Sequence, residues 1–182
     1  MCRFSLQPAP LKGLSVLQRH LIRDQRGSLD RLLCLDELKP LLGERTIVQV
    51  NYTVTAKSGT IRGMHFQYPP HAEMKLVTCL HGEIFDVAVD LRTGSPTFLN
   101  WHGEHLSANS HRTLAIPEGF AHGFQTLTDH CELLYLHTAA YQPDAEGGLD
   151  ALDPVLAIRW PLPVSERSAR DQAHAPITAA FA

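Results

Sequence analysis

The sequence predicts an all-β domain, an antiparallel sandwich or barrel with only a few short helices. Three observations support this prediction. Apolar and polar residues alternate with a period of two in several short segments, most clearly over residues 84–91. Gly and Pro residues separate these segments at close intervals, with little helix between them. The 182 residues, of which 44% are hydrophobic, fit a single domain over 1–182 with a well-formed core.

The expected elements follow one another closely along the chain. Residues 11–23 are predicted to form one or two opening strands and 24–27 a turn, because the latter are rich in Asp and Gly. A short helix is expected over 35–42, ending near Gly43. After residue 141 the chain becomes loop-rich, with a helical turn over 165–172. Further strands are expected over 46–55, 84–91, 97–101, 114–116, 124–127 and 132–137.

One window, residues 59–91, concentrates ionisable side chains among turns and strands. It contains Arg62, His65 and Lys75. In an extended segment His65 and Gln67 fall on one face, whereas the apolar residues between and before them fall on the other. His65 is therefore expected on the polar face of a strand, as in a functional site.

Charge and composition exclude several classes of protein. The net charge of −3 argues against general nucleic-acid binding, which needs a basic surface. The four cysteines stand far apart without a CxxC pair, as expected for free thiols in a reducing cytosol. The first 13 residues lack the apolar core of a signal peptide, and no run approaches a membrane span. We expect a cytoplasmic protein that binds neither membrane nor nucleic acid.

The residue types in this pattern suit acid–base chemistry beside a ketone. A His can take a proton near neutral pH, and a nearby cation such as Lys75 can stabilise the resulting enolate oxygen. Tyr135, on a predicted strand, could return the proton from the opposite side and so invert the carbon. Taken singly, His65, Lys75 and Tyr135 are more often structural residues. Only their convergence in space would make them a site.

A metal site is the alternative to this chemistry. The segment PEGFAH (117–122) resembles the second conserved motif of cupins, which are jelly-roll barrels. Many cupins bind a metal through an H-x-H pair, a Glu and a later His. Here Gln67 stands where the second His of the pair would follow His65, so Glu73 and His122 would complete only a depleted set. We therefore expect no metal.

The ordered blocks of the chain resemble the dTDP-4-dehydrorhamnose 3,5-epimerase family of the cupin superfamily. The resemblance runs from about residue 26 to residue 176 and is strongest in IRGMHFQYPP, KLVTCLHGEIFDVAVDLRTGSPTF, IPEGFAHGF and ELLYLHTAAY. It implies a cupin jelly roll and epimerisation of a nucleotide-diphospho-4-keto-6-deoxysugar at carbon 3, carbon 5 or both. It also implies a homodimer with exchanged strands, no cofactor, and a C-terminal segment (162–182) that packs near the site.

The resemblance also implies roles for individual residues. His65 falls at the position of the proton-abstracting base, and Asp171 at that of its carboxylate partner. Lys75 matches the cation that stabilises the enolate, with His122 close by, and Tyr135 matches the proton donor. Residues that match substrate-binding positions are Arg62 (diphosphate), Tyr141 (stacking on the nucleotide base), Gln49, Asn51, Glu146, Arg170, and Arg26, whose counterpart binds phosphate across the dimer.

Two departures from the family pattern lie in the segment after residue 27. Leu29 replaces the family's aromatic residue, and Arg31 replaces its nucleotide-contacting Glu. Asp30 would point to the other face of the strand. The nucleotide (dTDP, CDP or GDP) and the number of inverted carbons are therefore left open, as are a keto-isomerase of the same fold and a non-catalytic sugar-nucleotide-binding cupin.

Overall fold

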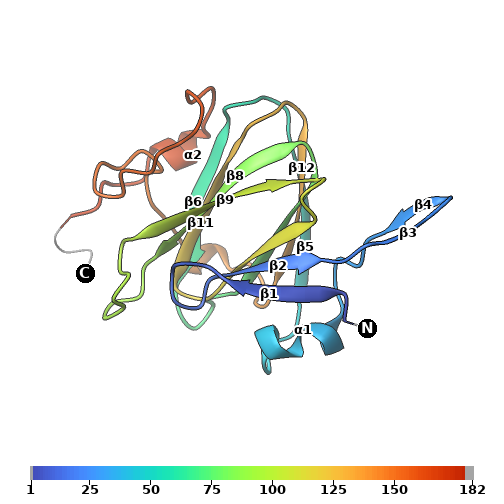
Figure 1. Ribbon diagram of the computed structural model, residues 1–182. Coiled ribbons are helices and arrows are strands. Elements are labelled where there is room, and N and C mark those ends of the chain that lie inside the picture. Colours follow the sequence, from blue (N-terminus) through green and yellow to red (C-terminus); the bar gives the residue numbers. More distant parts are fainter. Residues whose placement is uncertain (1, 179–182) are drawn as a thin grey trace.

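The computed structural model describes residues 2–178, which form two antiparallel sheets that face each other (Figure 1). This arrangement confirms the predicted jelly-roll sandwich. The six-stranded sheet has the order β1 (Phe4–Pro8), β2 (Ser15–Arg19), β10 (Arg112–Ile116), β7 (Lys75–His81), β12 (Cys131–His137) and β5 (Gln49–Thr55). The five-stranded sheet has the order β13 (Glu146–Gly148), β6 (Ile61–Gln67), β11 (Phe120–Thr126), β8 (Glu83–Asp90) and β9 (Trp101–Ser107).

The main core lies between the two sheets and follows the period-two pattern of the sequence. Val77 and Leu133 from the six-stranded sheet belong to the same buried cluster as Ile84 and Phe124 from the five-stranded sheet. All four are at most 2% exposed. Each such side chain contributes roughly 1.5–3 kcal/mol through burial of apolar surface. The sandwich therefore owes much of its stability to residues on the same inward-facing sides of the strands as the side chains that line its cavity.

The C-terminal segment covers the outer face of the five-stranded sheet. Leu149 and Leu156 pack against Met64 and Val87, so β6 and β8 are buried on both faces. The short helix α2 (Ala169–Gln172) contacts β6. The segment 162–178 thus lies beside β6, while residues 179–182 of the expected C-terminal segment fall outside the described residues. Within 2–178, no helix has the length and apolar character needed to cross a membrane.

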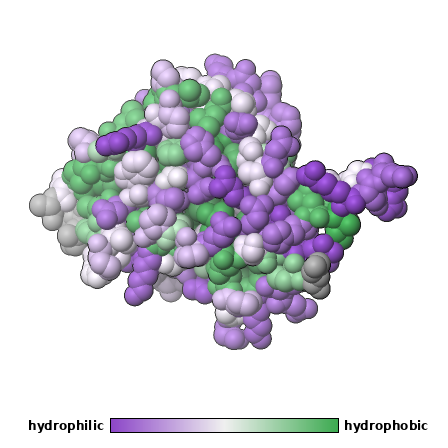
Figure 2. Space-filling view, viewed as in Figure 1, coloured by the Kyte–Doolittle hydropathy of each residue, from purple (hydrophilic) through white to green (hydrophobic). Residues whose placement is uncertain are grey.

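A hairpin of β3 (Ile22–Asp24) and β4 (Gly27–Leu29) projects from the body of the molecule (Figure 1). We call these residues, 22–29, the arm; its tip is hydrophilic in Figure 2. Arg19, buried in β2, holds the base of the arm through an ion pair with Asp30 at 3.0 Å. Arg31 pairs with Glu37 of α1 (Leu35–Leu42). Both charged residues after the arm are therefore engaged in anchoring it.

The strand expected over 97–101 is wrong, because residues 97–99 form turns and β9 begins at Trp101. The buried carboxylate of Asp90 accepts hydrogen bonds from the hydroxyls of Ser95 and Thr97, both at 2.6 Å. These bonds fold the segment back on the end of β8, which overrides the β preference of its side chains. The helix over 35–42, the turn at 24–27 and the helical turn within 165–172 are confirmed.

Gly103 in β9 offers a test of packing on the five-stranded sheet, because a Cβ there would lie 2.0 Å from Cζ of Phe85. We expect Gly103→Ala to lower the free energy of unfolding by roughly 1–3 kcal/mol through overpacking. Phe85→Leu removes the clashing ring atoms, so the double variant should lose less than the two single losses combined. Urea unfolding of the three variants measures this, and strict additivity would contradict the packing assignment.

Candidate active site

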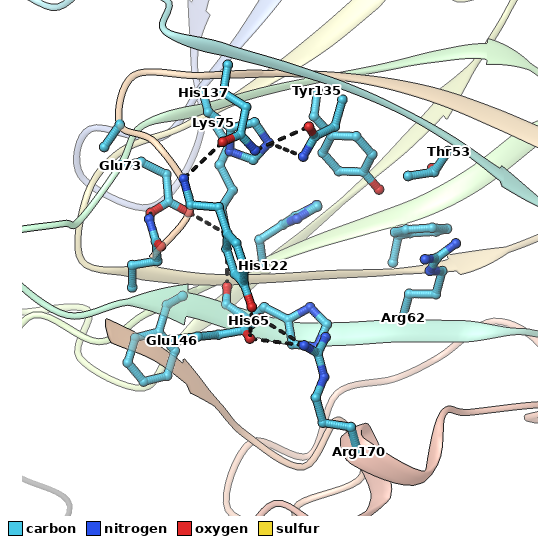
Figure 3. A pocket seen from close by; sticks show the side chains of 17 residues that line it. Thr53, Arg62, His65, Glu73, Lys75, His122, Tyr135, His137, Glu146 and Arg170 are labelled. Atoms are coloured by element: carbon cyan, nitrogen blue, oxygen red, sulfur yellow. Dashed lines mark hydrogen bonds and ion pairs between the residues drawn. The ribbon is translucent and has the colours of Figure 1, made fainter. Parts of the chain in front are cut away.

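A cavity of about 500 Å³ opens between the two sheets (Figure 3). All of the predicted site residues except Asp171 and Arg26 line it, so the structure brings together side chains that are up to 121 residues apart, from Gln49 to Arg170. Asp171 lies directly behind His65. The predicted residues in the lining are Gln49, Asn51, Arg62, His65, Lys75, His122, Tyr135, Tyr141, Glu146 and Arg170.

His65 on β6 is held by the buried carboxylate of Asp171. The His65 Nε2 to Asp171 Oδ1 distance is 2.9 Å, and the Gly63 backbone N–H donates to Asp171 Oδ2 at 3.1 Å. Burial alone would raise the pKa of Asp171, but the hydrogen bonds from His65 and Gly63 hold it well below its usual range. A neutral ring that donates from Nε2 to this carboxylate has its lone pair on Nδ1. This nitrogen can take a proton.

The helix α2 fixes Asp171 in this position. Ser168 is its N-cap, and the Ser168 hydroxyl accepts from the Asp171 backbone N–H at 3.0 Å. The neighbouring Arg170 points into the cavity, where its Nη1 pairs with Glu146 Oε2 at 3.0 Å and its Nη2 lies 3.1 Å from His65 Nε2. The predicted pairing of His65 with Asp171 is therefore present, with a guanidinium beside it.

Lys75 is a buried cation on β7. Its ammonium lies 3.1 Å from Glu73 Oε1 and donates to the backbone oxygen of His65 at 3.1 Å. The other oxygen of Glu73 accepts from Gln67 Nε2 at 2.6 Å. Glu73, considered above as a metal ligand, therefore holds an ammonium and an amide instead. Lys75 can stabilise negative charge that develops in the cavity.

His122 on β11 is held by a second buried carboxylate, Asp86 of β8, at 2.7 Å from Nε2 to Oδ1. The sequence argument missed Asp86. A signal existed, because an Asp inside the apolar alternation of 84–91 must be buried and therefore needs a partner. Two His–carboxylate pairs therefore stand at the cavity, and both of their histidines lie on the five-stranded sheet.

Tyr135 faces these pairs from the opposite sheet. It lies on β12 of the six-stranded sheet, whereas His65 and His122 lie on strands of the five-stranded sheet. The rings of Tyr135 and His122 meet edge to face with centroids 6.0 Å apart. Burial, reinforced by Asp86, raises the pKa of Tyr135, so its hydroxyl keeps its proton at neutral pH. Figure 3 shows the phenol and His65 on different walls of the cavity.

His137, which the sequence argument also missed, lines the same cavity. Its ring stacks on Tyr135 with centroids 6.1 Å apart, and its Nε2 lies 3.4 Å from the side-chain amide of Asn51. Burial, followed by the charge of Lys75, lowers the pKa of His137 to about 4. His137 is therefore neutral at physiological pH. The alternation of β12 after Tyr135 is the signal that could have found it.

The donors around His65 do not suit a metal ion. His65, Asp171 and His174 each offer one donor atom, and these atoms lie within 4.8 Å of one another. The guanidinium of Arg170, however, stands 3.1 Å from His65 Nε2, the nitrogen that already faces Asp171. A cation in this place repels a second one. We assign no metal to these three residues, and a metal-free protein stays a prediction.

Arg26 lies away from the cavity of its own chain. It is at the turn of the arm, where its side chain is 91% exposed and pairs with Asp24 at 2.6 Å. Asp30 and Arg31, which follow the arm, contact Arg19 and Glu37 rather than the cavity. Of the predicted binding residues, Arg26 alone therefore lies outside this cavity.

The sandwich and its cavity define a jelly-roll enzyme of the acid–base type, with a His–carboxylate pair and a Tyr on facing walls. The chain belongs to the dTDP-4-dehydrorhamnose 3,5-epimerase family, whose model matches residues 8–179. Its enzyme class is that of the epimerases.

Individual relatives agree with this assignment. The dTDP-4-dehydrorhamnose 3,5-epimerase of Salmonella typhimurium is 43% identical over 160 residues, 87% of each chain. The dTDP-4-dehydrorhamnose 3-epimerase of Streptomyces niveus is 38% identical over 168 residues, which cover 92% of this chain and 81% of that protein. The crystal structure of a Legionella pneumophila dTDP-6-deoxy-D-glucose-3,5-epimerase with dTDP-4-keto-L-rhamnose has a TM-score of 0.90 and 36% identity, covering 98% and 96% of the two chains.

The lowered pKa of His137 predicts a pH-dependent contribution to stability. In the unfolded chain His137 binds a proton below about pH 6.5, whereas in the folded chain it does so only near pH 4. Above pH 6.5 the ring is neutral in both states, and the stability of the folded protein is fully present. As the pH falls toward 4, the unfolded chain binds a proton that the folded chain does not, so the free energy of unfolding decreases. We expect His137→Phe to be spared about 2 kcal/mol of this loss between pH 7 and pH 4.5.

Urea unfolding of the wild type and His137→Phe at both pH values measures this difference. His20→Phe, at an exposed position outside the cavity, is the control and should track the wild type. Equal acid destabilisation of the wild type and His137→Phe would contradict the assignment of a neutral His137.

Proposed function

We propose that this chain epimerises a dTDP-linked 4-keto-6-deoxysugar at carbons 3 and 5. Family membership and the relatives support the reaction class, and the relatives' names support the dTDP-linked substrate. One observation about the site supports inversion of the carbon. His65 and Tyr135 stand on facing sheets of a single cavity, so a sugar bound between them is exposed to a base on one face and a phenol on the other.

The proposed mechanism uses four side chains. Nδ1 of His65 removes the proton from the carbon beside the 4-keto group, the C–H electrons form the C=C bond of the enolate, and the π electrons of the ketone move onto its oxygen. Lys75, with His122 nearby, stabilises the negative charge on that oxygen. The hydroxyl of Tyr135 then gives its proton to the opposite face of the same carbon, which inverts it.

Other lining residues suit the nucleotide diphosphate. Arg62 and Arg170 supply planar, fully charged donors for phosphate oxygens. Tyr141 is a half-exposed aromatic at the rim, oriented by a hydrogen bond from its hydroxyl to Glu146 at 2.8 Å. A base stacked on this ring would be fixed in place. We assign Arg26 of a partner subunit to the phosphates as well.

A homodimer accounts for two exposed features of the fold. β5 is the edge strand of the six-stranded sheet, and its outward side chains Val50, Tyr52 and Val54 are all more than half exposed, continuing the row begun by Val48. An apolar edge of this kind is a template for a second chain. Pairing there, together with the arm, would bring Arg26 to the cavity of a partner.

The proposal places this enzyme in the cytoplasm, where it acts on a nucleotide sugar and needs no nucleic acid, membrane or cofactor. The four cysteines are all free, which supports a reducing compartment. CDP- and GDP-linked substrates, a keto-isomerase and a non-catalytic binder are less favoured, because the family and its ligand-bound member are dTDP-sugar epimerases. Relatives include both 3,5-epimerases and a 3-epimerase, so the number of inverted carbons is an experimental question.

The two faces of the site predict different variants. In deuterated water with dTDP-4-keto-6-deoxyglucose, we expect deuterium at carbons 3 and 5 with the wild type and none with His65→Asn, because nothing else removes the proton. Tyr135→Phe should still exchange protons through His65, yet its rate of inversion should fall by about 10²–10⁴-fold. NMR follows both the exchange and the configuration.

Exchange with the wild type at one carbon only would mark a mono-epimerase. Undiminished inversion with Tyr135→Phe would contradict the assignment of the proton donor. Retained binding of dTDP by both variants, measured by calorimetry, is the control for folding.

The dimer proposal predicts a variant that loses both assembly and substrate affinity. Val50→Glu places a charge in the exposed apolar row of β5 and should give a monomer in light scattering. Substrate affinity should fall at least tenfold, since Arg26 of the partner is no longer supplied. Val155→Glu, at an equally exposed apolar position far along the chain, should remain dimeric. A wild-type protein that is monomeric and fully active would contradict the dimer proposal.

A further inference from the structure

His137 lines the cavity beside two residues of the proposed mechanism, although that mechanism gives His137 no role. Two positions after Tyr135 on β12, its ring is stacked on the phenol at 6.1 Å with an interplanar angle of 18°. In the sheet His137 is paired with Lys75 on one side and Gln49 on the other. It therefore lies next to both the proposed proton donor and the proposed cation for the enolate oxygen (Figure 3).

A directional chain of hydrogen bonds sets the tautomer of this ring. The backbone N–H of Tyr141 donates to Gln49 Oε1 at 2.9 Å, so the Gln49 amide nitrogen faces the other way. That nitrogen donates to Asn51 Oδ1 at 3.2 Å. The Asn51 nitrogen therefore faces His137 Nε2, 3.4 Å away, and donates to it. A ring that accepts at Nε2 and is neutral carries its hydrogen on Nδ1.

The Nδ1 hydrogen of His137 has no acceptor among residues 2–178, although the residue lines the cavity. The charged and titratable groups around the ring are Lys75, Glu73 and His122, and burial with Lys75 outweighs Glu73 in keeping the ring neutral. A donor that is fixed in direction and left without a protein partner in a ligand cavity is available for a ligand oxygen.

We propose that His137 is a further catalytic residue, whose Nδ1–H donates to the ketone oxygen of the sugar and strengthens that bond as the enolate forms. The inference rests on the proposed function. The oxygen gains charge as the π electrons of the ketone move onto it, and His137 donates a hydrogen bond without giving up its proton. A neutral imidazole serves this role because its N–H acidity is closer to that of an enol than the acidity of an imidazolium would be.

The chain Tyr141, Gln49, Asn51 then acquires a role of its own. Gln49 donates a hydrogen bond to Asn51, and Asn51 donates one to His137. The two amides therefore orient the His137 donor in addition to lining the cavity. The oxyanion site is completed by Lys75 on the neighbouring strand. Residues on three adjacent strands, β5, β12 and β7, would thus serve one oxygen.

Kinetics of two substitutions test the proposal. His137→Phe keeps the aromatic stack on Tyr135 and removes the donor, and kcat should fall about 10²-fold, as for loss of one oxyanion donor. The affinity for dTDP, which lacks the sugar, should stay within about twofold of the wild type. His137→Gln retains an N–H donor and should keep about tenfold more kcat than the Phe variant. His81→Phe, at an exposed position at the far end of β7, is the control and should retain wild-type kcat.

An NMR measurement tests the tautomer without any activity assay. In ¹⁵N-labelled wild-type protein at pH 7, His137 should show a protonated Nδ1 and an unprotonated Nε2. A protonated Nε2 would overturn the proposal, because the donor would then point to Asn51. This result would be independent of the reaction catalysed.

Three kinetic outcomes also overturn the proposal. Unchanged kcat in His137→Phe would show that the donor contributes nothing to the transition state. Loss of dTDP affinity with kcat retained would place the contact on the nucleotide. Equal losses in the Phe and Gln variants would indicate a role in packing. If the wild type itself fails to exchange protons of the dTDP sugar, the proposed function fails, and the NMR result still decides the tautomer.

Discussion

Three buried carboxylates hold the reactive end of this sandwich together. A charged or strongly polar side chain between two sheets is unfavourable unless a partner satisfies it. Asp171 satisfies His65, Asp86 satisfies His122, and Glu73 satisfies Lys75. Each carboxylate also fixes the direction of its partner. The polar cavity can therefore exist beside the apolar core clusters of the β-sandwich, and its side chains are oriented before any ligand binds.

The two-sheet architecture then supplies what a single sheet could not. Alternation within one strand places neighbouring polar residues on one wall only. Here His65 and His122 belong to the five-stranded sheet, and Tyr135, His137 and Lys75 belong to the other. A planar enolate between the walls would meet a base on one face and a phenol on the other. The requirement of inversion chemistry is thus met by the way the fold stacks its layers.

The sequence could predict what depends on local pattern and only part of what depends on distant contacts. The β alternation, the helix over 35–42 and the polar face of His65 follow from neighbouring residues, whereas the pairing with Asp171 needed the family resemblance. The pairing of His122 with Asp86 and the hydrogen-bond chain that reaches His137 join segments far apart in the sequence, so the sequence did not predict them. The error over 97–101 has the same origin, since Asp90 captures that segment through its carboxylate.

The arm shows how a departure in sequence can leave a family's chemistry in place. Arg31 stands where the family has a nucleotide-contacting Glu, yet in this fold it pairs with Glu37, while Asp30 pairs with the buried Arg19. Both residues are therefore used to fix the base of the arm. A two-stranded hairpin is only marginally stable alone. The ion pair of Asp30 with the Arg19 guanidinium, which is only 2% exposed, restrains the arm at its base. In the proposed dimer, such a restrained arm would present Arg26 to the partner subunit at a defined position. Under the proposed function, contacts to the nucleotide base fall to Tyr141 at the rim, so the charge reversal at residue 31 would change the arm without altering the reacting centre.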